Sequence, residues 1–278
     1  MIVTVYVTTK DRPVLLSRAL KSVVEQTYSE LDIIVVDDGS NELNHKRNYE
    51  IVNSFDKEIR YIYNAQSKGA CYSRNKAILM SKGEFITGLD DDDMFTTNRI
   101  ESFVDAWDDS FAFICANFVN VYSNIRKNHY RKGGVFGLHD LLKNNEASNQ
   151  IFTKVERLKA IGGFNVDVKK LQDWDTWLRL CYKYGGFKRL DESTYIMHHD
   201  HNHSRVSNNQ SYKLSLEQLV LRNKDIYDKN SALCINLLIM VQNGKLDIEL
   251  CKNSLLSGIS PLFILKQLVK LLLKKEVK

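Results

Sequence analysis

The stretch EFITGLDDDD, residues 84–93, decides the fold class, because a short apolar run of strand type ends in four consecutive carboxylates. Two earlier runs, Ile2–Thr8 and Leu31–Val36, have the same strand character and are also followed directly by polar side chains. In open α/β sheets, ligands bind outside the carboxyl ends of the strands. The three polar ends therefore predict one ligand site at one edge of a sheet.

Helical patterns alternate with these strands through the first ninety residues. We expect strands and helices in the order Ile2–Thr8, Pro13–Gln26, Leu31–Val36, Glu42–Phe55, Ile59–Tyr63, Ala70–Met80 and Glu84–Leu89. Alternation of apolar strands with helices is typical of an α/β protein whose mainly parallel sheet is flanked by helices on both faces.

The pattern is less regular after Thr96. We expect strands at Phe111–Tyr122, Asn149–Phe152 and Tyr195–His199, and helices at Leu138–Lys143 and Asp173–Tyr184. From Tyr212 the period is helical, with breaks at Gly244 and Gly258. This organisation predicts an α/β domain over 1–207, whose first half (1–95) has a nucleotide-binding type of architecture, and a C-terminal helical region over 208–278.

Composition excludes several classes of protein. With 278 residues, 44% hydrophobic and 26% charged, the chain is an ordinary globular protein and not a disordered one. Its five cysteines are odd in number and never form a C-x-x-C pair, so we expect neither a disulfide framework nor a zinc finger, and a reducing compartment. The amino terminus is typical of a first strand and not of a signal peptide, and no apolar run is long enough to span a bilayer, which predicts a cytoplasmic protein.

The net charge of +5 is concentrated at the carboxyl terminus, where residues 266–278 hold five lysines and one glutamate. This tail lacks the interleaved arginines and aromatic residues of a nucleic-acid-binding face, so we expect no nucleic acid partner. The helix expected at Ser260–Lys275 is amphipathic, with Lys266, Lys270 and Lys274 spaced four residues apart among many leucines. It indicates either packing within its own domain or binding to an anionic membrane surface, and we expect the latter.

Known phosphate-binding loops are absent after the first strand. The sequence VTTKDRP, residues 7–13, has neither the G-x-G-x-x-G turn of dinucleotide-binding enzymes nor a P-loop. The four carboxylates Asp90–Asp93 repel one another unless a cation lies among them, which predicts Mn²⁺ or Mg²⁺. The alternative is an acidic, solvated turn before the next helix.

Two further segments have side chains suited to chemistry. Asp173 begins an amphipathic helix, where it is either a general base for a hydroxyl proton or a structural helix cap. Residues 198–203 hold four histidines, and His199, His201 and His203 would share one face of a strand, so a zinc site is conceivable. We favour a single histidine that completes the coordination of a metal ion held by aspartate.

Together these motifs resemble family 2 glycosyltransferases with the GT-A fold. The resemblance covers Ile2–Ser207 and rests on an ordered set of motifs: T-T-x-D-R-P, V-D-D-G-S, G-x-x-x-x-R-N, L-D-D-D-D, G-G-F-N, Q-D-W-D-x-W and H-x-x-N-x-S. It implies a nucleotide-sugar site formed by Thr8, Thr9, Arg12, Asp38, Arg74, Asp90 and Asp91. Within that site, Asp38 would bind the uracil and Asp90 would lie near the ribose.

The resemblance also implies that residues 1–207 are a catalytic domain, with 1–95 as its nucleotide-binding half and 96–207 as its acceptor and metal half. Asp92 and His199 would bind the metal, although His198 and His201 are alternatives to His199, and Asp173 would be the base. The residue before the base is Gln172 where the family usually has glutamate, so any role of an acidic neighbour is open.

We therefore expect an inverting, metal-dependent enzyme that moves a hexose or N-acetylhexosamine from a UDP-sugar to a saccharide acceptor. By family habit, the acceptor would be a lipid-linked O-antigen or capsule intermediate at the inner face of the plasma membrane. The alternatives are a nucleotidyltransferase of similar fold, which should have a glycine-rich phosphate loop, and a non-catalytic sugar-binding protein at the membrane surface.

Overall fold

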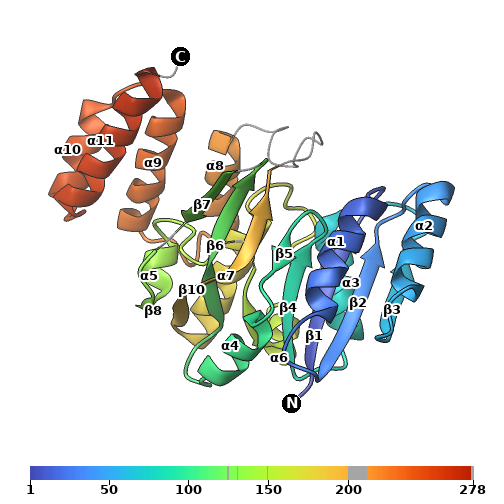
Figure 1. The fold of residues 1–278 in the computed structure, drawn as a ribbon. Coiled ribbons are helices and arrows are strands. Elements are labelled where there is room, and N and C mark those ends of the chain that lie inside the picture. The colour runs from blue at the N-terminus through green and yellow to red at the C-terminus, as the bar shows by residue number, and fades with distance from the viewer. Residues whose placement is uncertain (124, 130, 149, 200–211, 277–278) are drawn as a thin grey trace.

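A computed structural model of the chain describes residues 1–123, 125–129, 131–148, 150–199 and 212–276. Its first half is a parallel sheet (Figure 1). The strands are β1 (Val3–Thr9), β2 (Leu31–Asp37), β3 (Ile59–Tyr63) and β4 (Phe85–Asp90), and the helices between them are α1 (Pro13–Val24), α2 (Glu42–Asn53) and α3 (Ala70–Met80). Each lies within two residues of the bounds expected from the sequence.

The second half of the sheet is mixed. Its strands are β5 (Met94–Phe95), β6 (Ile114–Tyr122), β7 (Ile125–His129), β8 (Gly134–Phe136), β9 (Phe152–Lys154) and β10 (Phe187–His198). The order across the sheet is β3-β2-β1-β4-β9-β6-β10-β5, with β7 paired to β6 and β8 paired to β10. Beyond β4, among the described residues, the expected parallel pairing holds only between β6 and β10. Strand β9 runs antiparallel to both β4 and β6, and β5, β7 and β8 also pair antiparallel with their neighbours.

Several elements of this half differ from the sequence-based expectation. The strand expected at Tyr195–His199 begins eight residues earlier, at Phe187, and the strand expected at Asn149–Phe152 lies at Phe152–Lys154. The helices of this half are α4 (Arg99–Ala106), α5 (Leu138–Leu141), α6 (Val155–Ala160) and α7 (Gln172–Tyr184). Of these, α4 and α6 were not expected, because both are short and rich in charged residues.

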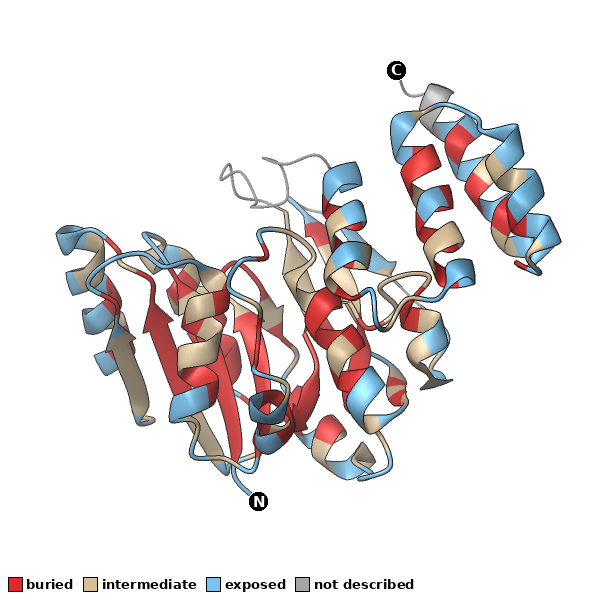
Figure 2. Ribbon diagram, turned by 180° about the vertical axis from the view of Figure 1, so that it is seen from behind, coloured by how far each residue is buried: buried red, intermediate tan, exposed pale blue. Residues whose placement is uncertain are grey.

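The central strands of the sheet are largely buried (Figure 2). Their alternate side chains belong to two separate apolar clusters. On one face, Val3, Val5 and Val7 of β1 pack with the buried side of α1. On the other face, Tyr6 packs with side chains from α3, α6 and α7. A strand buried on both faces must be apolar throughout, which explains the continuous apolar runs of β1, β2 and β4. The helices thus leave the carboxyl ends of these strands as the accessible edge.

The carboxyl-terminal region contains α8 (Tyr212–Arg222), α9 (Lys229–Asn243), α10 (Ile248–Leu256) and α11 (Pro261–Glu276). Leu216 and Leu219 of α8 and Ile235 and Ile239 of α9 pack into the main core. Other side chains of α9 form a separate apolar cluster with α10 and α11. The expected breaks at Gly244 and Gly258 are present, and both glycines have the positive φ of a helix C-terminus. The expected domain boundary at 207/208 lies outside the described residues. Among those described, no helix is both long and apolar enough to cross a membrane.

Candidate active site

The ends of β1 and β4 form the centre of the site. These two strands are neighbours, and Thr8 is in register with Asp90. From β1 the sheet is extended on one side by β2 and β3 and on the other side by β4, so the strand order changes direction between β1 and β4. Thr9 donates its hydroxyl to Asp91 Oδ2 at 2.7 Å, and Arg12 Nη1 lies 3.2 Å from Asp91 Oδ1 and 3.6 Å from Asp92 Oδ2. The polar ends that the sequence places after separate strands therefore meet at the reversal point, where open α/β sheets bind ligands.

The four carboxylates after β4 face different partners. Asp90 accepts hydrogen bonds from Arg74 and from Gln150 Nε2, each at 3.1 Å. Asp93 accepts from the Tyr195 hydroxyl at 2.8 Å and from the backbone N–H of His198 at 2.9 Å. The run is therefore not a solvated turn, since Asp91, Asp92 and Asp93 are all buried.

Burial and mutual repulsion raise the pKa values of two of these carboxylates, Asp91 and Asp93. Burial raises the pKa of Asp91 to about 7, against the lowering effects of Arg12 and Thr9 and with a further rise from Asp92 and Asp90. Burial and repulsion by Asp92 and Asp90 also raise the pKa of Asp93. A hard divalent cation relieves repulsion of this kind, and carboxylate oxygens are its preferred ligands. The chemistry of these donors suits Mn²⁺ or Mg²⁺, and a metal site at the carboxylate run stays a prediction.

Arg74 of α3 connects the carboxylate run to the start of α7. Its Nη2 lies 3.1 Å from Asp90 Oδ1, and its Nη1 donates to Gln172 Oε1 at 2.8 Å. Gln172 donates in turn to the carbonyl of Val168 at 3.0 Å. The amide thus gives Arg74 a neutral acceptor where a glutamate would add a negative charge, and of these two hydrogen-bond acceptors of Arg74 Asp90 is the charged one.

Asp173 lies in the first turn of α7 and is not its cap. The N-cap position is Leu171, which has the left-handed φ of 61° that costs an L-residue about 1–2 kcal/mol. Asp173 Oδ2 accepts from Asn145 Nδ2 at 3.0 Å. Burial raises the pKa of Asp173, while the N–H of Trp174, the charge of Arg74 and the Asn145 hydrogen bond lower it. A carboxylate with raised proton affinity is suited to accept a hydroxyl proton.

The carboxylate of Asp38 accepts five hydrogen bonds from residues of α3 and of the segment before it. It accepts from Ser67 Oγ at 2.7 Å, from the backbone N–H groups of Lys68 and Gly69 at 3.0 and 2.8 Å, and from Ser73 Oγ and Asn64 Nδ2 at 2.9 and 3.1 Å. Burial opposes ionisation, but these hydrogen bonds lower the pKa of Asp38 overall. The side chain shapes the wall beside β2, and its contact with uracil stays a prediction.

The two described histidines of the cluster lie at the end of β10. The ring of His199 stacks on Tyr122, with a centroid distance of 4.2 Å, and its Nε2 lies 2.8 Å from Asn120 Oδ1. His198 reaches the carboxylate run through its backbone N–H to Asp93. The described residues contain no group of three or more His, Cys, Asp or Glu side chains arranged around a metal site. His201 and His203 lie outside the described residues, so the choice of histidine stays a prediction.

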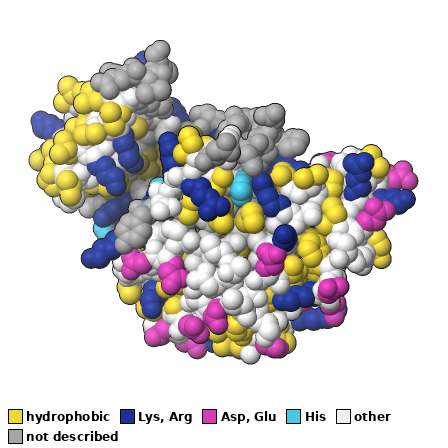
Figure 3. All heavy atoms as spheres, viewed as in Figure 1, with side chains coloured by type: hydrophobic (Ala, Val, Ile, Leu, Met, Phe, Trp, Pro, Cys, Tyr) yellow, Lys and Arg dark blue, Asp and Glu magenta, His cyan; other side chains and the backbone are white. Residues whose placement is uncertain are grey.

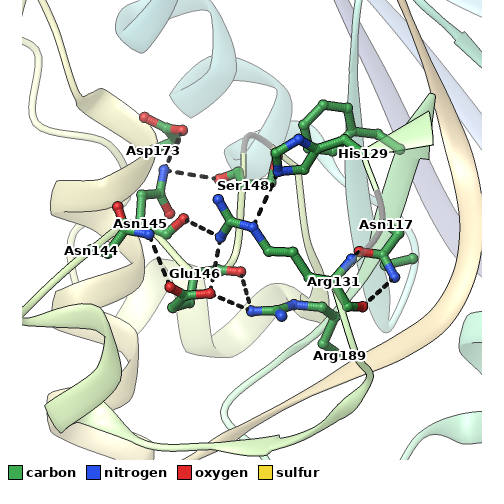
Figure 4. A pocket seen from close by; sticks show the side chains of 11 residues that line it. Asn117, His129, Arg131, Asn144, Asn145, Glu146, Ser148, Asp173 and Arg189 are labelled. Atoms are coloured by element: carbon green, nitrogen blue, oxygen red, sulfur yellow. Dashed lines mark hydrogen bonds and ion pairs between the residues drawn. The ribbon is translucent and has the colours of Figure 1, made fainter. Parts of the chain in front are cut away.

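A pocket of about 310 Å³ opens beside Asp173. Figure 4 shows its charged lining, with the guanidinium of Arg131 between Asp173 and Asn145 on one side and His129 on the other. Glu146 Oε2 pairs with Arg131 Nη1 at 2.9 Å and with Arg189 Nη2 at 2.7 Å. The site therefore has a second compartment, separated from the carboxylate run by Arg74 and the start of α7.

Sequence reasoning missed this compartment and two residues of the first one. Most of the pocket lining comes from residues 117–148, where no motif stands out, and Arg189 lies in a charged stretch that did not indicate a strand. In the first compartment, Gln150 holds Asp90, and Arg18 of α1 donates to the carbonyl of Asp92 at 2.6 Å. No local pattern in the sequence indicated Gln150 or Arg18.

A family model for glycosyl transferase family 2 matches residues 4–200. The chain belongs to glycosyltransferase family 2. It is accordingly a glycosyltransferase, and the resemblance inferred from the ordered motifs is confirmed.

Two relatives represent the sequence similarity. The chain is 33% identical over 236 residues to a putative colanic acid biosynthesis glycosyl transferase, WcaA, of Escherichia coli K12, covering 83% of this chain and 84% of the relative. It is 31% identical over 131 residues to the GalNAc(5)-diNAcBac-PP-undecaprenol beta-1,3-glucosyltransferase of Campylobacter jejuni, covering 46% of this chain and 42% of that enzyme.

Solved structures confirm the α/β fold with a helical carboxyl-terminal region. TarS residues 1–349 of S. aureus, in complex with UDP-GlcNAc, superposes with a TM-score of 0.68 at 14% identity, over 87% of this chain and 72% of that one. The mannosyltransferase PcManGT of Pyrobaculum calidifontis, in complex with GDP-Man and Mn²⁺, gives a TM-score of 0.56 at 14% identity, over 98% and 86%. At these identities the likeness concerns the fold.

Proposed function

We propose that this glycosyltransferase transfers a hexose or N-acetylhexosamine from a UDP-sugar to a hydroxyl of a lipid-linked saccharide, with inversion at the anomeric carbon. The observation that carries the proposal is the position of Arg74, which touches Asp90 on the nucleotide side and Gln172 beside the base. A donor bound along the ends of β1 and β4 would therefore present its anomeric carbon to the pocket that begins at Asp173.

The chemistry follows from the two compartments. The acceptor oxygen attacks the anomeric carbon, the bond from that carbon to the diphosphate oxygen breaks, and its electron pair stays with the nucleoside diphosphate. Asp173 accepts the proton of the acceptor hydroxyl. Arg12 and Arg74 lie where negative charge develops on the leaving group. Attack from the face opposite the leaving group inverts the configuration with a single carboxylate base.

Asp92, together with His199 or with His198 or His201 in its place, would hold the divalent cation. When bound, such a cation supplies positive charge that stabilises the departing diphosphate without a protonated side chain. Asp90 and Asp91 are already held by Arg74 and by Thr9 and Arg12, which leaves them suited to contact the nucleotide sugar. The Mn²⁺ in the mannosyltransferase PcManGT supports a metal in the same fold.

Two similarities support the choice of substrates. The TarS structure contains UDP-GlcNAc, and the Campylobacter jejuni relative is named for an acceptor on undecaprenol diphosphate. An acceptor of that kind is anchored in a bilayer, so the enzyme should work at a membrane surface, at the cytoplasmic face where we expect the donor. No glycine-rich phosphate loop follows β1, which disfavours a nucleotidyltransferase.

The outer face of α11 supports peripheral membrane binding. Leu262, Leu265, Val269, Leu272 and Leu273 are all exposed, and Leu255 and Leu256 of α10 add to the same apolar surface (Figure 3). The opposite face of α11, with Ile264 and Leu271, packs on α9. The helix is therefore apolar on two sides, only one of which is used by its own domain. Exposed Lys266 and Lys270 would add about 1 kcal/mol each near anionic lipids.

A screen of UDP-sugars tests the proposal. Purified protein is incubated with each UDP-sugar, Mn²⁺ and a panel of alkyl glycosides and sugar diphosphate lipids, and the product's anomeric configuration is read by NMR. We expect one donor to give an inverted product, and both EDTA and Asp92→Asn to abolish transfer while the far-UV spectrum is unchanged. Retention of configuration, or full activity of Asp92→Asn in EDTA, would show the proposal to be wrong.

A further inference from the structure

Two tryptophans of α7 hold the segment that leads to the wall of the pocket beside Asp173. The indole N–H of Trp177 donates to the carbonyl of Ser148 at 3.0 Å, and that of Trp174 donates to the carbonyl of Leu141 at 2.6 Å. Both tryptophans are buried, and both belong to the Q-D-W-D-x-W motif. A buried indole N–H usually has a partner, so the two contacts alone indicate a structural role. Trp177 differs from Trp174 in the carbonyl that it reaches.

The carbonyl of Ser148 connects Trp177 to Asp173. Asn145 Nδ2 donates one of its two hydrogens to this carbonyl at 3.2 Å and the other to Asp173 Oδ2 at 3.0 Å (Figure 4). Because a carbonyl and an ionised carboxylate can only accept, they fix which end of the Asn145 amide faces them. A continuous chain of three hydrogen bonds therefore runs from the Trp177 indole to the Asp173 carboxylate.

The backbone at Ser148 is strained. Its φ of 66° lies in the left-handed region, which is unfavourable for an L-residue. Such a conformation persists where surrounding contacts fix it, and it is common at functional sites. The donors from Trp177 and Asn145 that meet at the Ser148 carbonyl are contacts of this kind.

The ring of Trp177 is fixed by aromatic neighbours. Phe164 packs against it edge to face with a centroid distance of 5.7 Å, and the ring of Phe113 lies at 5.9 Å. Side chains in a close-packed interior keep defined rotamers, so the indole N–H has one direction. Asn145, in contrast, is half-buried and lies in a loop at the pocket. The chain of hydrogen bonds therefore joins a rigid donor in the core to a side chain of the site.

We propose that Trp177 is a positioning residue for the transfer reaction, because its indole N–H holds the Ser148 carbonyl and, through it, the Asn145 amide that fixes Asp173. The inference rests on the proposed function, since it takes Asp173 as the base. Trp177 lies outside the described lining of the pocket and acts through these partners. A small displacement of a catalytic group lowers the rate steeply, so loss of the indole donor should lower kcat.

Replacement of Trp177 by benzothienylalanine, at this position alone, tests the role of the N–H. The analogue keeps the bicyclic ring that packs on Phe164 and has sulfur in place of the N–H. We expect kcat to fall by roughly 5- to 10-fold, the effect of about one hydrogen bond, and the Kd of the UDP-sugar by calorimetry to stay unchanged. Trp177→Phe also lacks the donor and should lower kcat at least as far. Wild-type kcat with benzothienylalanine would overturn the inference, since packing would then be the role of Trp177.

A double-mutant cycle with Asn145→Ala separates positioning from packing. The chain is already broken in that background, so benzothienylalanine at Trp177 should then change kcat by less than about twofold. Benzothienylalanine at Trp174 is the matched control, because its N–H binds the carbonyl of Leu141 instead. The control should act by the same factor with and without Asn145→Ala. Equal effects of the Trp177 replacement in both backgrounds would assign it a purely structural role and contradict the inference.

The indole N–H signals test the chain without turnover. The protein has three tryptophans, so its nitrogen–proton correlation spectrum has three indole signals, which Trp174→Phe and Trp177→Phe assign. Asn145→Ala should move the Trp177 signal, because linked hydrogen bonds polarise one another. Asn144→Ala should not move it, because the Asn144 amide donates to Glu146. A Trp177 signal unmoved by Asn145→Ala would overturn the inference and leave the proposed function standing.

The base itself provides the remaining distinction. If Asp173→Asn keeps the wild-type kcat while Asn145→Ala still moves the Trp177 signal, the chain of hydrogen bonds is present but ends at a residue that is not the base. That result would refute the mechanism in the proposed function and, with it, the role of Trp177 in the reaction.

Discussion

At the residue scale, the position of Asp173 depends on groups from three separate segments. Asn145 holds one carboxylate oxygen, Arg74 lies near through its contact with Gln172, and the left-handed turn at Leu171 starts the helix that projects it. Strained backbone of this kind persists where the surrounding structure fixes it, and it is common at functional sites.

Replacement of Asp173 by Asn tests its role as the base. The amide keeps the size of the side chain but cannot accept the proton, so we expect kcat to fall by roughly 10²–10⁴-fold, the range of a positioned general base. Because Asp173 lies outside the carboxylate run, the affinity for the UDP-sugar should be unchanged by calorimetry. Loss of donor affinity in parallel with kcat would assign Asp173 a structural role instead.

The pH dependence of turnover should report the environment of Asp173. Burial raises its pKa above the ordinary 3.8 of aspartate, and only the deprotonated form accepts a proton, so activity should fall at a higher pH than for an exposed carboxylate. Asn145→Ala removes a hydrogen bond that lowers this pKa. We therefore expect the acidic limb of the kcat/KM profile to move to still higher pH in that variant.

Asn144→Ala is the matched control for this profile. Asn144 also lines the pocket, but its amide donates to Glu146 and not to Asp173. Its acidic limb should coincide with that of the wild type. A shift of equal size in both variants, or none in Asn145→Ala, would contradict the assignment of the limb to Asp173.

At the element scale, the turn between α6 and α7 is fixed by two adjacent glycines with positive φ. Gly162 and Gly163 have φ of 76° and 67°. A side chain at Gly162 would meet open space, whereas one at Gly163 would collide with Asn75, which accepts from the N–H of Phe164 at 2.7 Å and donates to its carbonyl at 2.7 Å. Phe164 in turn lies under the Arg74 guanidinium, 5.3 Å from its ring centroid.

Alanine at these two positions separates backbone strain from the Asn75 contact. Gly162→Ala should lower the free energy of unfolding by about 1–2 kcal/mol, the cost of an L-residue in the left-handed region. Gly163→Ala should cost more, because the turn must also move away from Asn75, and it should weaken donor binding through Arg74. Urea denaturation and calorimetry measure the two effects. Equal destabilisation by both substitutions would show that Asn75 does not hold the turn.

The packing of individual strands explains how far the sequence predicts the fold. In the first ninety residues β1, β2 and β4 are buried on both faces, so a continuous apolar run is sufficient to identify each of them. In β10, the segment FKRLDEST is largely charged, yet Arg189 is buried because Glu146 and the ring of Phe136 pack against it. Such compensation comes from residues more than forty positions away and leaves no local pattern.

The residues of the site likewise fall into a group that the sequence predicts and a group that it does not. Thr8, Thr9, Arg12 and Asp90–Asp93 follow from the rule that ligands bind at strand ends, and the structure places them together. The pocket of Arg131, Glu146 and Arg189 forms only when β7, β8 and β10 come together in the sheet, so no spacing along the chain could reveal it. Ligand contacts of the individual residues stay predictions.

At the scale of the whole molecule, the pocket and the apolar surface of α10 and α11 belong to one arrangement. Lys270 comes from the same helix as the exposed Leu265 and Leu272 and lies within electrostatic reach of Arg131. A bilayer that covered the outer face of α11 would therefore lie close to the pocket beside Asp173, where we propose that the acceptor binds. A lipid-linked acceptor could then enter the pocket with its chain still in the membrane.

This arrangement predicts that membrane binding and acceptor length are coupled. Leu265→Glu with Leu272→Glu should release the protein from anionic vesicles in flotation at low salt, because two apolar contacts are replaced by charges that anionic lipids repel. We expect that variant to lose most of its kcat/KM for a polyprenyl-linked acceptor in vesicles and to keep its kcat/KM for a short, soluble acceptor. Leu43→Glu with Leu79→Glu, at exposed sites on α2 and α3, is the control and should change neither. Wild-type flotation by the α11 variant, or equal loss with both acceptors, would separate the apolar surface from the active site and contradict the coupling.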